Sequence, residues 1–353
     1  MNSLAMFSTL RKALADPDLA LDLGTANTRL YGQGVGLVAD EPSVVQFHRE
    51  NGSVESIGSI ALRNSLHSKE QILVSPLRAG VVADVDAAAA MLAPLLKRAR
   101  RYGLIKPRVL ACAPTDARED EREALIEATR RAGASSVAIA LEPMAAAIGV
   151  GLDVSSEYAQ MLVDIGDGVT DIAVIRSGSL VKTSAIRIAC RDMIEAIQRL
   201  GAERCRATPY LSEAMRLLRK VGAADRKLPS SPLVVAGADW RIGAQRRVQV
   251  SCKEVVEAID PVIEKIVGSI SQAVKDLPPE LACEVIEGGI HLTGGGACLP
   301  GMAGLIAGAT LIEVKVATNP LRAVIDGARK MLATAAETNL WATGLQGGLQ
   351  MKT

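Results

Sequence analysis

The sequence predicts an α/β fold built from two similar halves, each with a mainly mixed sheet. Three observations lead to this prediction. Apolar strand segments alternate with amphipathic helical segments along most of the chain. Two stretches, 22–28 and 164–171, each place an Asp-x-Gly turn between apolar segments. The length of 353 residues exceeds one ordinary domain and gives each half enough chain for its own core.

The first half is predicted to hold a hairpin, a turn-rich insertion, and then alternating helices and strands. Glu142-Pro143 starts the last helix, because proline at a first-turn position loses no hydrogen bond. The other predicted elements are short strands over about 32–76, a helix over 87–101, a strand over 109–113, a helix over 116–132 and a strand over 137–141.

The second half repeats this order after its own hairpin. A long helix is predicted to end at Pro278-Pro279, and the Arg-rich stretch 201–250 has less pattern. The remaining elements are a strand over 184–187, a helix over 192–200, the long helix over 253–277, a strand over 286–292, a helix over 299–307, a strand over 312–316, a final helix over 320–334 and a loose tail over 338–353.

The two Asp-x-Gly turns have the composition of phosphate-binding hairpins. Asp22-Leu23-Gly24-Thr25-Ala26-Asn27-Thr28 lies between Leu19-Ala20-Leu21 and Leu30-Tyr31. Gly24 allows close approach of the backbone, and successive N–H groups can form a concavity that binds an anion. An aspartate at a strand end can hold hydrated Mg²⁺, which prefers oxygen ligands. One such turn is more often only a turn, but the Asp164–Asp171 stretch repeats the pattern 142 residues later (164 minus 22).

Leu292-Thr293-Gly294-Gly295-Gly296 adds a third glycine-rich turn after an apolar strand. Together with Asp40-Glu41-Pro42-Ser43-Val44-Val45 and Glu142-Pro143-Met144-Ala145-Ala146-Ala147-Ile148-Gly149, these motifs occur in the order found in one family. The chain resembles the actin-like ATPase superfamily and, within it, the bacterial cytoskeletal MreB family. The resemblance extends from about residue 1 to about residue 335.

The resemblance implies the ribonuclease-H-like actin fold, with two lobes of two subdomains around a nucleotide cleft. The expected first lobe comprises 1–147 and 318–337, with a small insertion subdomain at about 32–76. The expected second lobe comprises 148–317, with a small subdomain at about 188–250, and the loose tail follows.

The resemblance also implies a site for ATP and Mg²⁺. Asp22 and Asp164 would flank Mg²⁺ through its waters, and Glu142 would orient the attacking water. A glutamate before proline at a helix start is also favourable for the helix dipole alone, so its catalytic role depends on the resemblance. The expected phosphate- and nucleoside-binding positions are Gly24, Thr25, Ala26, Asn27, Gly166, Asp167, Gly168, Val169, Thr170, Lys220, Gly294, Gly295 and Gly296.

Three parts of the sequence depart from the MreB pattern. Asp167 and Val169 replace the more common Gly and Thr, which predicts slower hydrolysis if that threonine helps hold the water. Ala189-Cys190-Arg191-Asp192 replaces Gly-Gly-Asp and is more like actin. Lys220 stands where many relatives have a ribose-binding Glu, which predicts weaker or shifted nucleotide binding.

Composition narrows the function classes. Forty Lys and Arg against 39 Asp and Glu give a net charge of +1, which argues against a nucleic-acid-binding protein. Aromatic residues are only 2% of the chain, so the core must be built from Ala, Val, Leu and Ile. The six cysteines show neither C-x-x-C pairing nor a nearby His, which favours buried free thiols in a reducing cytosol.

Two segments are candidates for membrane contact. Leu4, Phe7 and Leu10 share helical spacing next to Arg11 and Lys12, which is typical either of a terminus packed on its own domain or of an interfacial amphipathic helix. Leu104 and Ile105 occupy the position of a hydrophobic membrane-insertion loop in MreB proteins. No apolar run reaches the length of a membrane span, so we expect a cytoplasmic protein, peripheral on the inner face of the cell membrane.

The resemblance favours a filament-forming ATPase whose protomers stack head to tail on an anionic membrane and act with cell-wall elongation proteins to set cell shape. Three alternatives remain: a small-molecule kinase on the same fold, a chaperone-like or cell-division relative, and a structural paralogue that polymerises with little or no hydrolysis. The departures at Val169 and Lys220 support the last of these.

Overall fold

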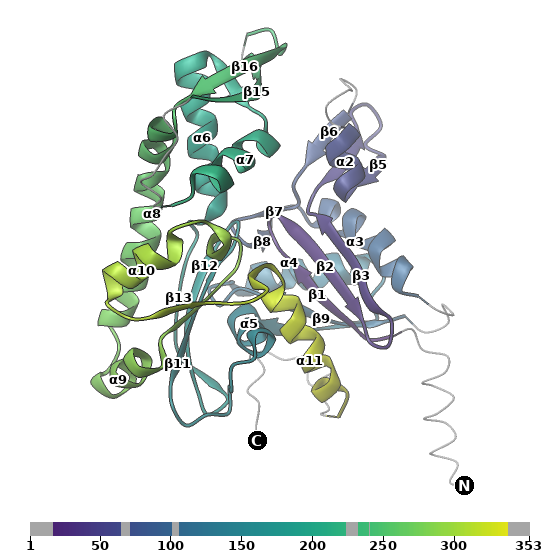
Figure 1. The fold of residues 1–353 in the computed structure, drawn as a ribbon. Helices are drawn as coiled ribbons and strands as arrows, with labels where there is room; N and C mark the ends of the chain where they lie inside the picture. The colour runs from purple at the N-terminus through teal and green to yellow at the C-terminus, as the bar shows by residue number, and fades with distance from the viewer. Residues whose placement is uncertain (1–16, 65–70, 101–105, 224–231, 240, 338–353) are drawn as a thin grey trace. The chain divides into compact units, whose positions relative to one another are not determined.

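The computed structural model describes residues 17–64, 71–100, 106–223, 232–239 and 241–337 (Figure 1). The chain forms two compact units. The first comprises Met1–Asp153 with Arg322–Thr353, and the second comprises Val154–Leu321. A five-stranded mixed sheet lies in each unit, so the predicted α/β class and the repeated mixed sheet are confirmed.

In the first unit the sheet has the order β10-β9-β1-β2-β3. The strands are β1 (Leu19–Leu23), β2 (Asn27–Gly32), β3 (Gly36–Pro42), β9 (Arg108–Ala113) and β10 (Ser136–Leu141). Strands β1, β2 and β3 pair antiparallel as a meander, whereas β9 pairs parallel with both β1 and β10. The carboxyl ends of β1, β9 and β10 therefore lie at one edge of the sheet.

Side chains that alternate along β1 enter two different cores. Leu19, Leu21 and Leu23 pack against α3 (Val85–Ala99) and α4 (Glu119–Arg131). Ala20 lies on the opposite face, in a core with residues of α5 (Glu142–Val150) and α11 (Ala323–Glu337). Because successive side chains of a strand point to opposite faces, Asp22 shares the face of Ala20.

Helices α5 and α11 cross in backbone contact, and two glycines allow it. A β-carbon placed on Gly149 or on Gly327 would overlap the carbonyl oxygen of the other helix, that of Ala323 or Ala145 respectively. Six of the ten buried residues of this core are alanine or cysteine, in agreement with the low aromatic content. The helix that begins at Glu142 is thus fixed against the C-terminal helix.

The insertion in the first unit forms small sheets of its own. One has the order β5-β4-β6 and is followed by the two-stranded β7-β8 ribbon. Its elements are β4 (Val45–His48), β5 (Val54–Ile57), α2 (Gly58–Asn64), β6 (Gln71–Val74), β7 (Leu77–Arg78) and β8 (Val81–Val82).

The second unit repeats the strand arrangement of the first, in the order β13-β12-β11-β17-β18. Its strands are β11 (Gln160–Ile165), β12 (Thr170–Arg176), β13 (Ser179–Ile186), β17 (Ile290–Thr293) and β18 (Val314–Val316). Strands β11, β12 and β13 form an antiparallel meander, and β17 pairs parallel with β11 and with β18. The two main sheets therefore share one topology.

One continuous core serves the whole second unit, including a smaller sheet of order β14-β15-β16. The elements are α6 (Cys190–Cys205), β14 (Ala207–Pro209), α7 (Leu211–Val221), β15 (Leu233–Asp239), β16 (Gln245–Val250), α8 (Cys252–Lys275), α9 (Pro279–Gly288), the 3₁₀ turns η1 (Gly296–Cys298) and η2 (Pro320–Arg322), and α10 (Met302–Thr310).

Several sequence predictions are corrected by these elements. The predicted strand over 286–292 is wrong in its first half, because Pro278 and Pro279 start the helix α9 rather than a loop. Ile286 lies on that helix and is 56% exposed, whereas the strand β17 begins only at Ile290. The predicted strand over 184–187 and helix over 192–200 are parts of the longer β13 and α6.

The predicted N-terminal helix with Leu4, Phe7 and Leu10, and the loop with Leu104 and Ile105, lie outside the described residues. Within the described ranges, no helix combines the length and apolar character needed to cross a bilayer.

Candidate functional site

The first Asp-x-Gly turn connects β1 and β2 as predicted. The amide of Gly24 donates to the carbonyl of Asn27 at 3.1 Å, which closes the turn. A β-carbon on Gly24 would lie 3.0 Å from that same carbonyl oxygen, so the tight turn favours glycine. Gly24, Thr25, Ala26 and Asn27 are all partly exposed.

Side chains around this turn fix its shape. Thr25 Oγ1 accepts a hydrogen bond from the amide of Gly80 at 3.0 Å, which leaves its hydroxyl proton available. The hydroxyl of Ser43 donates to the carbonyl of Gly24 at 2.6 Å and meets that of Thr28 at 2.9 Å. Thr28 is fully buried, so it supports the turn from inside. Asn27 donates to Asp40 at 3.3 Å.

Asp22 is a buried carboxylate with a cation opposite it. It is 7% exposed and lies directly across the β1–β2 ladder from Arg29, whose guanidinium is 3.3 Å away. Burial raises the pKa of Asp22 above its ordinary value, and Arg29 opposes this effect only in part. The protein thus keeps a carboxylate at a strand end at an energetic cost, which is typical of functional sites.

Glu142 follows β10 at the same edge of the first unit's sheet as Asp22, with β9 between the two strands. β10 ends at Leu141, and Glu142 is the first residue of α5, with Pro143 in the first turn as predicted. Burial raises the pKa of the Cys112 thiol, and the carboxylates of Asp22 and Glu142 raise it further. Cys112 on β9 therefore lies between the carboxylates at the ends of β1 and β10.

The second hairpin, between β11 and β12, matches the first position by position. The amide of Gly166 donates to the carbonyl of Val169 at 3.0 Å, and a β-carbon on Gly166 would lie 3.0 Å from that oxygen. Asp164 is 9% exposed at the end of β11, and Thr170 is fully buried. Each of these residues stands 142 positions after its counterpart in the first hairpin, as Asp164 does after Asp22.

The tip of the second hairpin differs from the first in its charge. Asp167 pairs with Arg191 of α6, with Nη2 2.8 Å and Nε 3.0 Å from one carboxylate oxygen. Val169 is buried and apolar, and the hydroxyl of Thr170 donates to the carbonyl of Ile188 at 2.8 Å. At this tip Gly166 and Asp167 are partly exposed, whereas Gly168 is buried.

The third glycine-rich turn packs on the second hairpin. Gly294 has a φ of +83°, and a β-carbon there would overlap Asp164 Oδ1 and the carbonyl oxygen of Ile165. A β-carbon on Gly296 would overlap the side chain of Ile165. Close packing therefore requires glycine at positions 294 and 296, whereas Gly295 is partly exposed and less closely packed.

Lys220 lies in the last turn of α7 and is exposed. The residues that follow α7 reach the segment after the glycine-rich turn, because the amide of Ala223 donates to the carbonyl of Pro300 at 2.7 Å. The end of α7 thus lies next to Pro300, which follows the glycine-rich turn in sequence.

Comparison with known proteins identifies the family. The family model described as MreB/Mbl protein matches residues 16–340. The chain belongs to the MreB/Mbl family. It is 36% identical over 327 residues to the cell shape-determining protein MreB of Escherichia coli K12, covering 89% of this chain and 93% of that protein. It is 35% identical over 317 residues to the cell shape-determining protein Mbl of Bacillus subtilis 168, covering 89% and 95%.

Solved structures of MreB-like proteins agree in fold. MreB5 of Spiroplasma citri, bound to AMPPNP, is 27% identical with a TM-score of 0.83, covering 93% of this chain and 99% of that one. A MamK double helical filament is 20% identical with a TM-score of 0.74, covering 91% and 99%. The predicted actin-like fold and the resemblance to the MreB family are confirmed.

For this MreB/Mbl family member, sequence reasoning overlooked three side chains that shape the hairpins. Arg29 could have been found from hairpin register, since it is directly opposite Asp22. Ser43 and Arg191 were named only as members of the Asp40–Val45 and Ala189–Asp192 motifs, because their contacts with the hairpins form only in the folded protein.

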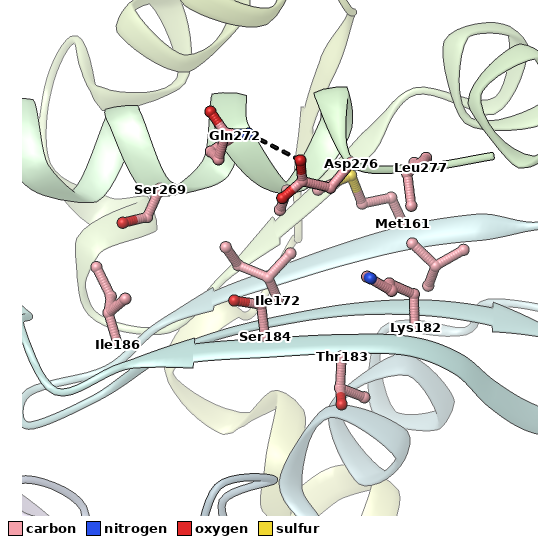
Figure 2. Close-up of a pocket in the computed structure, with 12 residues that line it drawn as sticks. Met161, Ile172, Lys182, Thr183, Ser184, Ile186, Ser269, Gln272, Asp276 and Leu277 are labelled. Carbon is pink, nitrogen blue, oxygen red and sulfur yellow. Dashed lines mark hydrogen bonds between the residues drawn. The ribbon is translucent and has the colours of Figure 1, made fainter. Parts of the chain in front are cut away.

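A separate cavity of about 290 Å³ lies in the second unit (Figure 2). It is between the sheet face of β11, β12 and β13 and the C-terminal half of α8, where Gln272 donates to Asp276 at 2.8 Å. None of the predicted site residues lines it. The cavity is therefore distinct from the hairpin site of this MreB/Mbl protein.

Proposed function

We propose that this MreB/Mbl family member binds ATP with Mg²⁺ through its two Asp-x-Gly hairpins. The observation that supports this most is their shared construction: a buried aspartate at a strand end, then a glycine whose amide closes the turn, at the same spacing in both units. Nucleotide-bound MreB5 of Spiroplasma citri, with AMPPNP or ADP, adds support from a relative.

The donor set suits Mg²⁺ held mainly through water. Asp22 and Asp164 supply oxygen ligands, the type that Mg²⁺ prefers, and the ion keeps several waters and binds nucleotide phosphates. Within the described parts of the chain, no three His, Cys, Asp or Glu side chains gather closely enough to cage a metal by themselves. Asp22 and Asp164 would thus orient the waters of an ion that neutralises phosphate charge.

Different residues of the chain would bind the phosphates, contact the nucleoside and orient the attacking water. Partly exposed backbone at Gly24–Asn27, together with the Thr25 hydroxyl, would bind phosphate oxygens, as would the backbone around Gly166–Thr170. Gly294–Gly296 and Lys220 would contact the nucleoside, and Glu142 would orient the attacking water.

Two substitutions test this division. Asp164→Ala should abolish Mg²⁺-dependent ATP binding, measured by titration calorimetry with and without chelator. Glu142→Ala should keep ATP binding but lose phosphate release. Unchanged affinity in Asp164→Ala would refute the hairpin site, and unchanged phosphate release in Glu142→Ala would refute the water-orienting role.

A weakly hydrolysing structural protein is the second candidate. Val169 is 6% exposed and apolar, and the Thr170 hydroxyl is engaged with Ile188, so the second tip adds no side-chain hydroxyl to hold water. Val169→Thr should then raise phosphate release in a protein that already binds ATP. Wild-type release as fast as that of Val169→Thr would argue against this candidate.

We further propose that the protein polymerises head to tail and sets cell shape with cell-wall elongation proteins, as a peripheral protein on the inner face of the membrane. Its cell shape-determining relatives support the family role. Electron microscopy with ATP and anionic vesicles tests assembly. Deleting residues 1–14 and changing Leu104 and Ile105 to Ser should sharply reduce vesicle sedimentation, and binding should weaken at high salt. Equal sedimentation would exclude these membrane patches.

A further inference from the structure

The tip of the second hairpin is joined to α6 at several points. The amide of Arg191 donates to the carbonyl of Asp167 at 2.8 Å, and the amide of Cys190 donates to the carbonyl of Gly166 at 3.3 Å. The Asp167–Arg191 ion pair adds a third connection, with side chains only 12% and 29% exposed. These three interactions hold the hairpin tip against the first turn of α6.

Negative charge is concentrated around this junction. Burial raises the pKa of the Cys190 thiol, and the carboxylates of Asp167, Asp164 and Asp192 contribute to the same rise. Asp192 also caps α6, since it accepts a hydrogen bond from the amide of Ala189 at 2.9 Å. Three carboxylates therefore act electrostatically on the Cys190 thiol.

Arg191 is the cation that the structure places directly on Asp167, the residue between Gly166 and Gly168. Burial raises the pKa of Asp167, and Arg191 opposes that rise, so the cation balances the charge of Asp167 at the hairpin tip. Repulsion between like charges within several ångströms is strong where water is partly excluded. The repulsion grows with the charge of the ligand.

We infer that Arg191 is a positioning residue that neutralises Asp167, and so allows the second hairpin to accept nucleotide phosphate, a triphosphate more than a diphosphate. This inference rests on the proposed function and deepens it. The Asp167–Arg191 pair sets how strongly the protein distinguishes the two nucleotide states, because the additional phosphate brings additional negative charge to the tip.

The test compares Kd values for Mg-AMPPNP and Mg-ADP in full-length variants by titration calorimetry. Arg191→Gln removes the cation and should weaken Mg-AMPPNP binding roughly tenfold, about 1.4 kcal/mol, with a smaller loss for Mg-ADP. Arg191→Lys should restore part of the difference. Asp167→Asn should shift the ratio of the two Kd values in favour of Mg-AMPPNP, opposite to the shift in Arg191→Gln. In the double variant this ratio should return close to the wild-type value.

A matched control separates this role from ordinary stabilisation. Arg246 pairs with Asp239 at 3.1 Å in the smaller sheet of the same unit, and Arg246→Gln should leave both Kd values unchanged. A purely structural pair would change thermal stability and weaken both nucleotides by the same factor. If Arg191→Gln fails to fold, Asp167→Asn still gives the shift in ratio.

The outcomes are distinguishable. Wild-type protein that binds neither nucleotide would overturn the proposed function and this inference with it. Wild-type protein that binds both, with the same ratio of Kd values in Asp167→Asn and Arg191→Gln, would overturn the inference alone.

Discussion

Replacing Gly327 with alanine should destabilise the first unit by pushing α11 away from α5. The added methyl would overlap the carbonyl oxygen of Ala145 and would lie 2.5 Å from its carbonyl carbon. Ordinary contact begins at 3.4 Å, so the helices must separate by at least 0.9 Å (3.4 minus 2.5). The obstacle is backbone, which cannot rotate away as a side chain can.

The magnitude follows from two opposing effects. Alanine favours a helix interior over glycine by about 1 kcal/mol. Overpacking by a methyl group costs about 1–3 kcal/mol, occasionally more. Because the clash at Gly327 is with backbone, the upper end applies, and we expect a net loss of about 1–2 kcal/mol in the free energy of unfolding.

Gly268 provides the control. It lies within α8, and a β-carbon there would meet nothing within 4 Å. Gly268→Ala should therefore keep the full gain of about 1 kcal/mol. Urea unfolding followed by circular dichroism should give a lower midpoint for Gly327→Ala and a higher one for Gly268→Ala. Equal midpoints would refute the close helix crossing. Because α5 begins at Glu142, Gly327→Ala should also reduce any phosphate release.

Two further substitutions test the first hairpin. The raised pKa of Asp22 means that the folded protein holds this proton more tightly than the unfolded chain, so stability falls as the pH rises from about 3.8 through the raised value. Asp22→Asn should therefore raise the melting temperature of nucleotide-free protein at pH 7, and the gain should shrink towards pH 4. Arg29 would still be paired with Asp40, which is 3.1 Å away. A lower melting temperature of Asp22→Asn at pH 7 would contradict this prediction. Ser43→Ala should cost about 1–3 kcal/mol, because it removes the hydroxyl between Gly24 and Thr28; calorimetry showing no loss would mean that the turn does not depend on that hydroxyl.

Local pattern predicted the hairpins well because their signal is contained in a few adjacent residues. Apolar segments on both sides of Asp-x-Gly specify strand, turn and strand without help from the rest of the chain. The helix α9 was missed because Pro278-Pro279 ends one helix and also starts the next, and because Ile286 continued an apolar run into β17.

Contacts between distant segments could not be predicted from such patterns. Nothing in the local sequence distinguishes Gly149 and Gly327 from other helix residues. Only the crossing of α5 with α11 explains why both positions require glycine. The pairing of Arg191 with Asp167 likewise depends on the fold, which brings the start of α6 to a hairpin tip. The sequence indicated the type of residue at each position, while the partner came from packing.

The cysteines differ in burial, so their reaction with a thiol reagent can report local opening of the protein. Cys112 is the sole cysteine of the first unit's sequence and is buried, as are Cys190 and Cys252 in the second unit. The prediction of buried thiols is wrong for Cys283 and Cys298, which are exposed there. A thiol reagent added to the native protein would label Cys283 at once. It would label Cys112 only when the layer between β9 and α11 opens, because buried thiols react through transient exposure. The labelling rate of each residue, read by mass spectrometry of peptides, would therefore time the opening of each unit separately in the unmodified chain.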